Sequence, residues 1–370
     1  MKNLKFMLIK GNKLIAKDIR NILLIQLGDI GDVVWATPTF RAVKEAYLQA
    51  NVSVLLRESF GSLLEADPHI HKIFQIKRSN ENFLKRAGKQ LLFIRELRKE
   101  HFDLVFDLRS DDRGAYMALL SGAQIRAALL YRGLKWRNFL FTHLVVPPVT
   151  NKIIYGAAEQ SLQIVREFGI DAKDTVPKLW VYEKVKKCAK QLLDDNGVMT
   201  SGRWITLNPF SRWHYKEWDY EKWVKVIDWL WEEYKIPTVI VGATEERKKS
   251  IDIANKCKGR IYNLTGKTSL GELAGVLSLS SLNIGVDSAA PHIAAAVGTP
   301  TITIYGPSEW LVWAPLGEMH SVITPDRDCA PCHQKGCAGS GTSKCLKELT
   351  IDKVERAIHG ALDKSGILTT

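Results

Sequence analysis

Two short segments, one in each half of the chain, carry the residue types best suited to chemistry. The first, GDIGD at residues 28–32, directly follows the apolar run 21–27. The second, GVDSAAPH at residues 285–292, directly follows the segment 281–284. Each pattern is typical of a strand that ends in a turn of small residues and continues into a helix. Such a turn places backbone N–H groups and a helix N-terminus at the edge of a parallel sheet, where anions and nucleotides bind.

Asp32 is the candidate for acid–base catalysis. A carboxylate at the start of a helix is commonly a cap, and capping is the simpler interpretation. This turn, however, holds two aspartates, Asp29 and Asp32. A spare carboxylate at the carboxyl edge of a sheet can accept a proton from an incoming hydroxyl group. We therefore predict that Asp32 is a general base and that Asp29 serves the turn.

The second segment has the properties of a phosphate site. Its small residues allow a diphosphate to approach the backbone, and the N–H groups of residues 288–290, which include Ser288 and Ala289, can bind it. His292 lies one turn into the helix and is either a further donor or a buried core histidine. Asp287 is either part of the site or a helix cap.

Two further strand ends in the second half add polar groups to the same predicted edge. The segment NPFSRWHYKEW at 208–218 supplies Ser211 and Lys216, and Lys216 can neutralise charge on a leaving phosphate. The turn GATEE at 242–246 supplies Glu245 and Glu246, which either bind ribose hydroxyls or serve as N-terminal helix acids. No G-x-G-x-x-G fingerprint, Walker A segment or G-x-S-x-G elbow is present.

Strands and helices alternate through both halves, which predicts two doubly wound α/β domains that face a cleft. The expected strands are 21–27, 52–56, 72–76, 104–108 and 124–128, then 204–208, 238–241, 261–264, 282–286 and 301–305. We expect an N-terminal extension over 1–19, a first domain over 20–175 and a second over 176–350. We expect a C-terminal helix within 351–370, and packing of this helix on the first domain is one alternative.

The chain has a net charge of +12, and most of it lies in the first half. Residues 1–175 hold 27 basic and 18 acidic side chains. This imbalance favours an anionic partner, such as an acidic glycolipid or a membrane surface. Nucleic acid is not expected, because the known binding motifs are absent. No apolar run has the length of a membrane span or a signal peptide, so we expect a cytoplasmic protein.

Four of the six cysteines cluster near the C-terminus, at Cys329, Cys332, Cys337 and Cys345. In a cytoplasmic chain such a cluster indicates metal or redox chemistry more than disulfides. The spacing C-x2-C-x4-C-x7-C is not a standard zinc pattern. We therefore favour free thiols in an ordered loop over 329–345, with a structural zinc site as the alternative.

Taken together, the segments resemble glycosyltransferase family 9, the ADP-heptose:lipopolysaccharide heptosyltransferases, from about residue 20 to 360. The resemblance rests on GDVV at 31–34 followed by Pro38, on Lys216-x-Trp218 after Asn208, and on DSxxxH at 287–292 followed by YGP at 305–307. The cysteine cluster also looks like one found in many members.

The resemblance implies a GT-B fold and metal-independent, inverting transfer of heptose from ADP-heptose to the lipopolysaccharide inner core. It implies that Asp32 is the base, that Lys216, Ser288 and nearby N–H groups hold the diphosphate, and that His292 supports them. Glu245 or Glu246 matches the ribose-binding acid. The enzyme would be peripheral at the inner face of the inner membrane. Basic residues of the first domain would bind the anionic acceptor: Arg109, Arg113, Arg132, Lys135 and Arg137.

Three alternatives remain open from the sequence. A transferase of the same fold could use another nucleotide sugar. A sugar-nucleotide 2-epimerase shares the fold but does not need a large basic acceptor surface. A non-catalytic nucleotide-binding protein does not need Asp32. The sequence does not fix the acceptor sugar, the linkage or the oligomeric state.

Overall fold

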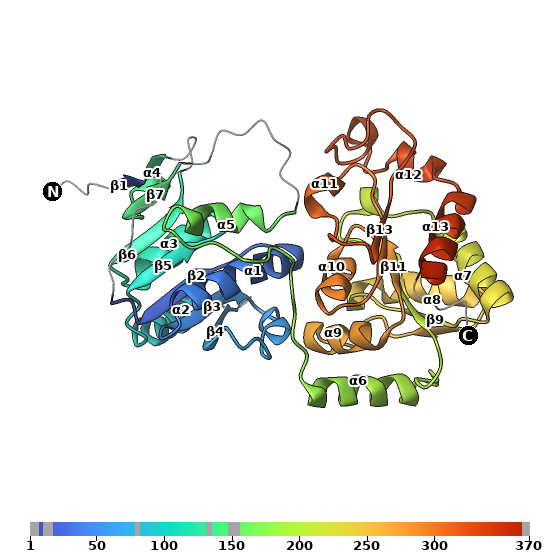
Figure 1. The fold of residues 1–370 in the computed structure, drawn as a ribbon, viewed down its shortest axis with the longest axis horizontal. Helices are drawn as coiled ribbons and strands as arrows, with labels where there is room; N and C mark the ends of the chain where they lie inside the picture. Colours follow the sequence, from blue (N-terminus) through green and yellow to red (C-terminus); the bar gives the residue numbers. More distant parts are fainter. Residues whose placement is uncertain (1–6, 10–17, 78–81, 131–134, 147–155, 365–370) are drawn as a thin grey trace. The chain divides into compact units, whose positions relative to one another are not determined.

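The structure, a computed structural model, describes residues 7–9, 18–77, 82–130, 135–146 and 156–364. The chain divides into two compact units, Met1–Leu179 and Trp180–Thr370, close to the boundary expected at residue 175 (Figure 1). Each unit is a parallel sheet with helices on both faces. The expectation of an α/β protein with two doubly wound, Rossmann-like sheets is confirmed.

Unit 1 holds a seven-stranded parallel sheet in the order β1-β7-β6-β5-β2-β3-β4. The five strands predicted in this half are present as β2 (Asn21–Ile25), β3 (Asn51–Arg57), β4 (Lys72–Ile76), β5 (Leu104–Asp107) and β6 (Ile125–Leu129). Two strands were not predicted, β1 (Met7–Ile9) at the edge of the sheet and β7 (His143–Val145) between β1 and β6. β1 falls within the segment 1–19, which was expected to be an N-terminal extension but pairs with β7 in the sheet of unit 1.

The helices of unit 1 cover both faces of its sheet. Helices α1 (Ile30–Ala46) and α5 (Glu159–Arg166) pack together, and the hydroxyls of Thr39 and Ser161 lie 2.7 Å apart between them. Helices α2 (Phe83–Arg98) and α3 (Asp112–Leu120) bury residues against the core that contains Leu23 and Ile25. The short elements η1 (Gly61–Leu63) and α4 (Lys135–Asn138) lie in connecting segments.

Unit 2 holds a six-stranded parallel sheet in the order β10-β9-β8-β11-β12-β13. The five predicted strands are present as β8 (Ile205–Asn208), β9 (Thr238–Ile240), β10 (Ile261–Asn263), β11 (Asn283–Val286) and β12 (Thr301–Ile304). The edge strand β13 (His320–Ile323) was not predicted. Its register places Ile304 beside Ile323.

Two hydrophobic cores fill unit 2, one on each face of the sheet. The first joins β8, β11 and β12 to α7 (Tyr220–Tyr234), α8 (Arg247–Lys256) and α13 (Ile351–Lys364). The second joins β9 to α6 (Glu183–Asp195) and α9 (Leu270–Leu279). Short elements complete the unit: α10 (Ala289–Ala296), α11 (Trp310–Trp313), α12 (Lys344–Glu348), η2 (His214–Lys216), η3 (Thr244–Glu246) and η4 (Cys337–Gly339).

The C-terminal helix α13 packs within unit 2, against α7, β12 and β13. Its residues Val354, Ile358 and Leu362 are fully buried there. The helix therefore buries its apolar face in its own unit, in place of the alternative of packing on the first domain. No helix in the described part of the chain is long and apolar enough to cross a membrane.

Each sheet has one point where its strand order reverses direction. In unit 1 the reversal lies between the neighbours β2 and β5, and in unit 2 between β8 and β11. Ligands of doubly wound sheets bind at the carboxyl ends of the strands at such a point. The segment 28–32 follows β2, and the segments 208–218 and 285–292 follow β8 and β11. The chemically promising residues therefore lie at the two reversal points.

Candidate active site

The site in unit 2 is built around an ion pair between Lys216 and Asp287. Lys216 Nζ lies 2.6 Å from Asp287 Oδ2, and the two side chains are 21% and 8% exposed. Lys216 comes from η2 after β8, and Asp287 directly follows β11. The buried carboxylate of Asp287 therefore holds the ammonium group at the reversal point, in a setting where its charge is less screened than at an open surface.

The N-terminus of α10 lies beside this pair in the chain. Ser288 is the N-cap residue, and its Oγ donates to Asn208 Oδ1 at the end of β8. The N–H groups of Ala289 and Ala290 fall in the first turn, where they have no acceptor within the helix. Pro291 in the same turn has no N–H to satisfy. The cap thus fixes two backbone donors next to the lysine, which is a suitable arrangement for an anion.

His292 is buried, with 6% of its surface exposed. Burial lowers the pKa of His292 to about 4; the Asp287 carboxylate raises it and the Lys216 ammonium lowers it. The imidazole is therefore neutral at neutral pH and offers one N–H donor. Both readings of His292 from the sequence fit this position, because it is a core histidine that lies close to the charged pair.

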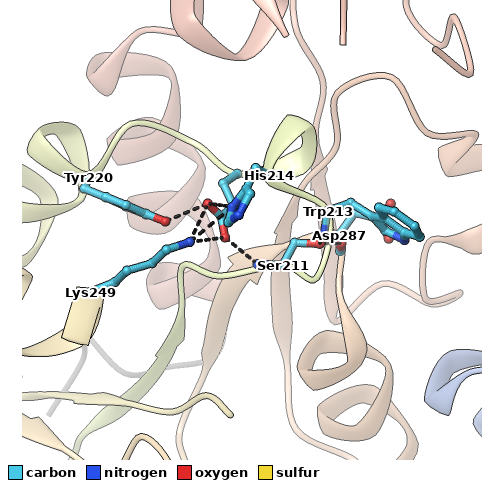
Figure 2. Close-up of polar contacts among 7 residues, drawn as sticks. Ser211, Trp213, His214, Tyr220, Lys249 and Asp287 are labelled. Carbon is cyan, nitrogen blue, oxygen red and sulfur yellow. Dashed lines mark hydrogen bonds and ion pairs between the residues drawn. The ribbon is translucent and has the colours of Figure 1, made fainter. Parts of the chain in front are cut away.

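A network around Glu217 fixes the loop that carries Lys216, and Figure 2 labels its partners Ser211, His214, Tyr220 and Lys249. The Glu217 carboxylate accepts hydrogen bonds from the Tyr220 hydroxyl at 2.6 Å and from the Ser211 N–H at 3.1 Å. It also contacts His214 Nδ1 at 3.0 Å and Lys249 Nζ at 3.3 Å. These partners hold the pKa of Glu217 below its ordinary value despite burial, which by itself raises it.

Ser211 connects this network to the ion pair. Its N–H donates to Glu217, and its hydroxyl lies 3.4 Å from the backbone oxygen of Asp287. Ser211 is 6% exposed, so it supports the loop from inside. Its place beside the donor-binding candidates is as the sequence suggested, and its contacts are with its own loop and with the backbone of Asp287.

The two acids after β9 differ in their surroundings. Glu245 is exposed. Glu246 turns back, and its Oε2 accepts a hydrogen bond of 2.7 Å from the N–H of Ala243. Burial raises the pKa of Glu246, and the Glu217 carboxylate adds to that shift. The exposed Glu245 and the backbone-bound Glu246 therefore differ in how their carboxylates are used.

In unit 1, Asp32 lies in the first turn of α1 at the reversal point. Its Oδ2 accepts a hydrogen bond of 2.7 Å from the N–H of Asp29, and its Oδ1 accepts one of 2.5 Å from Arg109 Nη1. A Cβ atom at Gly28 would lie 2.5 Å from Asp32 Cβ, so only glycine permits this close turn. Asp29 instead pairs with Arg57 at the end of β3, at 2.7 Å.

The electrostatics of Asp32 suit a proton acceptor. Its side chain is 9% exposed. Burial raises the pKa of the carboxyl group above its ordinary value, and the Arg109 guanidinium opposes that shift. A carboxylate with a raised pKa is a stronger base than an exposed one. The capping role and the catalytic role are compatible, because Asp32 also accepts the Asp29 N–H.

The basic residues expected to bind an acceptor fall into three groups. Arg109 and Arg113 are exposed. Arg132 and the side chain of Lys135 lie outside the described residues. Arg137 is 1% exposed and its Nη2 donates to the carbonyl of Leu129, so an acceptor role does not fit its position. Its charge is used to satisfy the backbone at the end of β6.

Asp107, the last residue of β5, is a buried acid that the sequence did not single out. Its Oδ1 accepts a hydrogen bond of 3.0 Å from the Ser110 N–H, and its Oδ2 has no hydrogen-bond partner among the described residues. Burial raises the pKa of Asp107 to about 7. The Ser110 contact shapes the turn that carries Arg109. Asp107 could have been identified from the sequence as an acid at the end of the strand next to the reversal point.

Glu217 was also missed as a functional residue. It was visible in the segment 208–218, directly after Lys216. Its partners come from α7 and α8 as well as its own loop. Contacts between separate elements leave no pattern in the local sequence. The only signal for Glu217 in the sequence was therefore its position next to Lys216.

The four clustered cysteines are free thiols, and only Cys345 is buried. Burial raises the pKa of the Cys345 thiol. Within the ranges that the structure describes, no group of three or more His, Cys, Asp or Glu side chains is arranged to hold a metal ion. Free thiols in an ordered loop over 329–345 stay a prediction, with a structural zinc site as the alternative.

Comparisons with known proteins identify the family and the fold of this chain. The sequence pattern of glycosyltransferase family 9 (heptosyltransferase) matches residues 91–342. Lipopolysaccharide heptosyltransferase 3 of Escherichia coli (strain K12) is 30% identical over 78% of this chain and 83% of its own. A family 9 glycosyl transferase from Veillonella parvula shares the fold, with a TM-score of 0.82 at 19% identity over 95% of this chain and 100% of its own.

A second solved structure, E. coli ADP-heptose lps heptosyltransferase II, aligns with a TM-score of 0.73 at 19% identity. The alignment covers 93% of this chain and 99% of that one. The resemblance stated from the strand-end motifs is thus confirmed by sequence and by fold. The chain belongs to glycosyltransferase family 9, the heptosyltransferases.

Proposed function

We propose that this protein transfers heptose from ADP-heptose to the lipopolysaccharide inner core, with inversion at the transferred carbon. In this proposal unit 2 holds the nucleotide sugar and unit 1 supplies the base and the acceptor contacts. The observation that carries it is the Lys216–Asp287 pair beside the N-terminus of α10, at the reversal point of a sheet. The identities of the donor and the acceptor are proposed from the family of the chain and from the names of its relatives.

The donor half of the reaction needs positive charge near the departing diphosphate. Lys216 and the first-turn N–H groups of α10 supply it, and Ser288 fixes that turn. Their effect grows as the bond from the sugar carbon to the phosphate oxygen breaks, because negative charge then builds up on that oxygen. His292 supports the site as a neutral donor, and Glu245 is the proposed ligand of the ribose.

The acceptor half needs a base. The acceptor hydroxyl attacks the anomeric carbon of heptose, ADP departs from the opposite face, and the hydroxyl proton passes to Asp32. A single displacement of this kind inverts the configuration. The transition state resembles the oxocarbenium ion known from glycosidases.

The acceptor is proposed to be anionic, which suits the basic first unit. A guanidinium carries five N–H donors, so Arg109 can remain paired with Asp32 and still bind a phosphate or an acidic sugar. Arg113 is exposed at the start of α3 and is the second proposed contact. We place the enzyme in the cytoplasm, peripheral to the inner face of the inner membrane, where such an acceptor would be reached.

The proposal is tested by mixing purified protein with ADP-heptose and a heptose-deficient core acceptor. The expected result is release of ADP and the addition of one heptose to the acceptor, seen by mass spectrometry. Turnover of another nucleotide sugar with no use of ADP-heptose would contradict the donor. Isomerisation of a nucleotide sugar without an acceptor would indicate an epimerase.

ADP should bind without a divalent metal. Lys216 and the α10 N-terminus provide the positive charge that a metal ion provides in other phosphate sites. We expect the same dissociation constant by calorimetry with and without a chelator. A strict Mg²⁺ requirement for binding would contradict this account of the donor site.

The substitution Glu217→Gln should raise the KM for ADP-heptose about tenfold and leave kcat closer to that of the wild type. The amide keeps the size of the side chain but cannot accept from Ser211, Tyr220, His214 and Lys249 together. The loop that carries Lys216 then loses its fixed position. Hydrogen bonds to a charged group contribute about 1.5–3 kcal/mol, which sets the scale of the effect.

Tyr220→Phe is the matched control, because it removes only one donor to Glu217 and should change KM less. Steady-state kinetics at several donor concentrations measure both variants. Equal KM values for Glu217→Gln and the wild type would show that the network does not position Lys216.

A further inference from the structure

Helix α2 has an unusual first half. Every described side chain from Lys85 to Leu92 is exposed. Leu91 and Leu92 are 52% and 64% exposed. The helix joins the core only in its second half, where Phe93 contacts Phe74 and Leu97 is fully buried. A surface helix normally buries its leucines in the core. Leu91 and Leu92 are instead exposed and can contact another surface.

The same helix is strongly basic. Residues 83–99 contain six lysines and arginines and a single acid, Glu96. At about 100° per residue, Lys85, Arg95 and Lys99 fall within roughly 120° of arc together with the two leucines. These three cations are exposed. The basic leucine face, defined as Lys85, Leu91, Leu92, Arg95 and Lys99, therefore combines positive charge with apolar surface.

The position of α2 within unit 1 relates this face to the candidate site. The outer strand β4 ends at Ile76, and the chain returns along α2 to begin β5. The start of α2 is therefore at the carboxyl edge of the sheet, the edge that also carries Asp32 and Arg109. The basic leucine face runs from Lys85 near that edge to Lys99 at the other end of the helix.

We propose that the basic leucine face of α2 binds the surface of an anionic lipid bilayer. The inference rests on the part of the proposed function that places the enzyme at such a membrane. Basic side chains gain energy near anionic headgroups, and leucines gain by entering the boundary between headgroups and acyl chains. Charge complementarity alone would suit nucleic acid equally, but nucleic acid gives two exposed leucines nothing to bury against.

The test is co-sedimentation of the full chain with vesicles of phosphatidylethanolamine and phosphatidylglycerol. We expect binding that falls at least tenfold with phosphatidylcholine vesicles. The variant Leu91→Gln/Leu92→Gln should bind about tenfold more weakly, because it loses buried apolar surface. The variant Lys85→Gln/Arg95→Gln/Lys99→Gln should lose tenfold or more, since each basic residue near the surface contributes about fivefold.

Matched controls carry the same changes elsewhere. Leu48, 69% exposed, is the control for the leucines as Leu48→Gln. Lys187, Lys190 and Lys248, all exposed on helices of unit 2, are the control for charge as a triple Gln variant. Both controls should bind vesicles like the wild type. Unchanged melting temperatures would show that the α2 variants remain folded.

Vesicle binding equal to the wild type in both α2 variants would overturn the proposal. The proposal would also be overturned if the charge variant lost vesicle binding and RNA binding equally while the leucine variant kept its vesicle binding. That result would indicate a nucleic-acid-binding surface. Transfer to a short, lipid-free acceptor separates this inference from the proposed function. The α2 variants should keep that activity, and a wild type that binds vesicles but transfers no heptose would refute only the function.

Discussion

Replacing Asp32 with asparagine should lower the turnover of heptosyl transfer by about 10²–10⁴-fold, the usual worth of a general base. Asparagine keeps the size of the side chain, but its single carbonyl oxygen can accept from only one of Asp29 N–H and Arg109, which bind different oxygens of Asp32. It cannot take a proton. ADP affinity, measured by calorimetry, should stay unchanged, because the donor groups belong to unit 2. Near-wild-type turnover would mean that Asp32 is only a cap.

The stability of this variant should be close to that of the wild type, because the loss of one hydrogen bond and the removal of a buried charge oppose each other. Burial raises the pKa of Asp32 in the folded state. At a pH above that pKa, the ionised carboxylate therefore lowers the stability of the folded state. A neutral side chain removes this cost. The wild type should also lose kcat/KM as pH falls through the raised pKa, and the variant should lack that acid limb. Asp29→Asn is the matched control, because Asp29 is half exposed and pairs with Arg57.

The second large effect is expected for Lys216→Met, which should lower kcat by about 10²–10³-fold, as loss of one group that stabilises developing negative charge does. Methionine keeps most of the apolar stem but removes the ammonium group. The variant also leaves Asp287, whose side chain is 8% exposed, without its cation. Thermal unfolding should therefore show a lower melting temperature.

A double variant separates catalysis from stability. Lys216→Met/Asp287→Asn removes both charges, so the buried carboxylate no longer lacks a partner and the melting temperature should recover. Turnover should stay low, because the positive charge is still missing. Recovery of turnover in the double variant would show that Lys216 acts only by pairing with Asp287.

Most strands were predictable from local pattern. Buried parallel strands such as β2 and β11 lead into turns of small or polar residues, and both features are local. The strands β1, β7 and β13 were missed; β1 and β13 lie at sheet edges, and β7 lies next to β1. Their pairing is decided by the neighbouring strand and not by their own sequence.

The site was predictable only in its local parts. The turns that carry Asp32 and Ser288 are encoded by adjacent residues, so the sequence located them. The pairing of Lys216 with Asp287 joins positions 71 residues apart, and the Glu217 network draws on three segments. Arg137 shows the opposite failure: a basic and aromatic stretch suggested a surface, but the guanidinium is buried against a backbone carbonyl.

Each unit holds a hydrophobic core made from its own residues, while the candidate site residues are in the loops that leave the strands. Evolution can therefore alter the loops of one unit without rebuilding either core. In the proposed division of roles, substitutions in unit 1 would change the acceptor and substitutions in unit 2 would change the donor. The separation of the cores would then let the acceptor preference change without loss of the donor site.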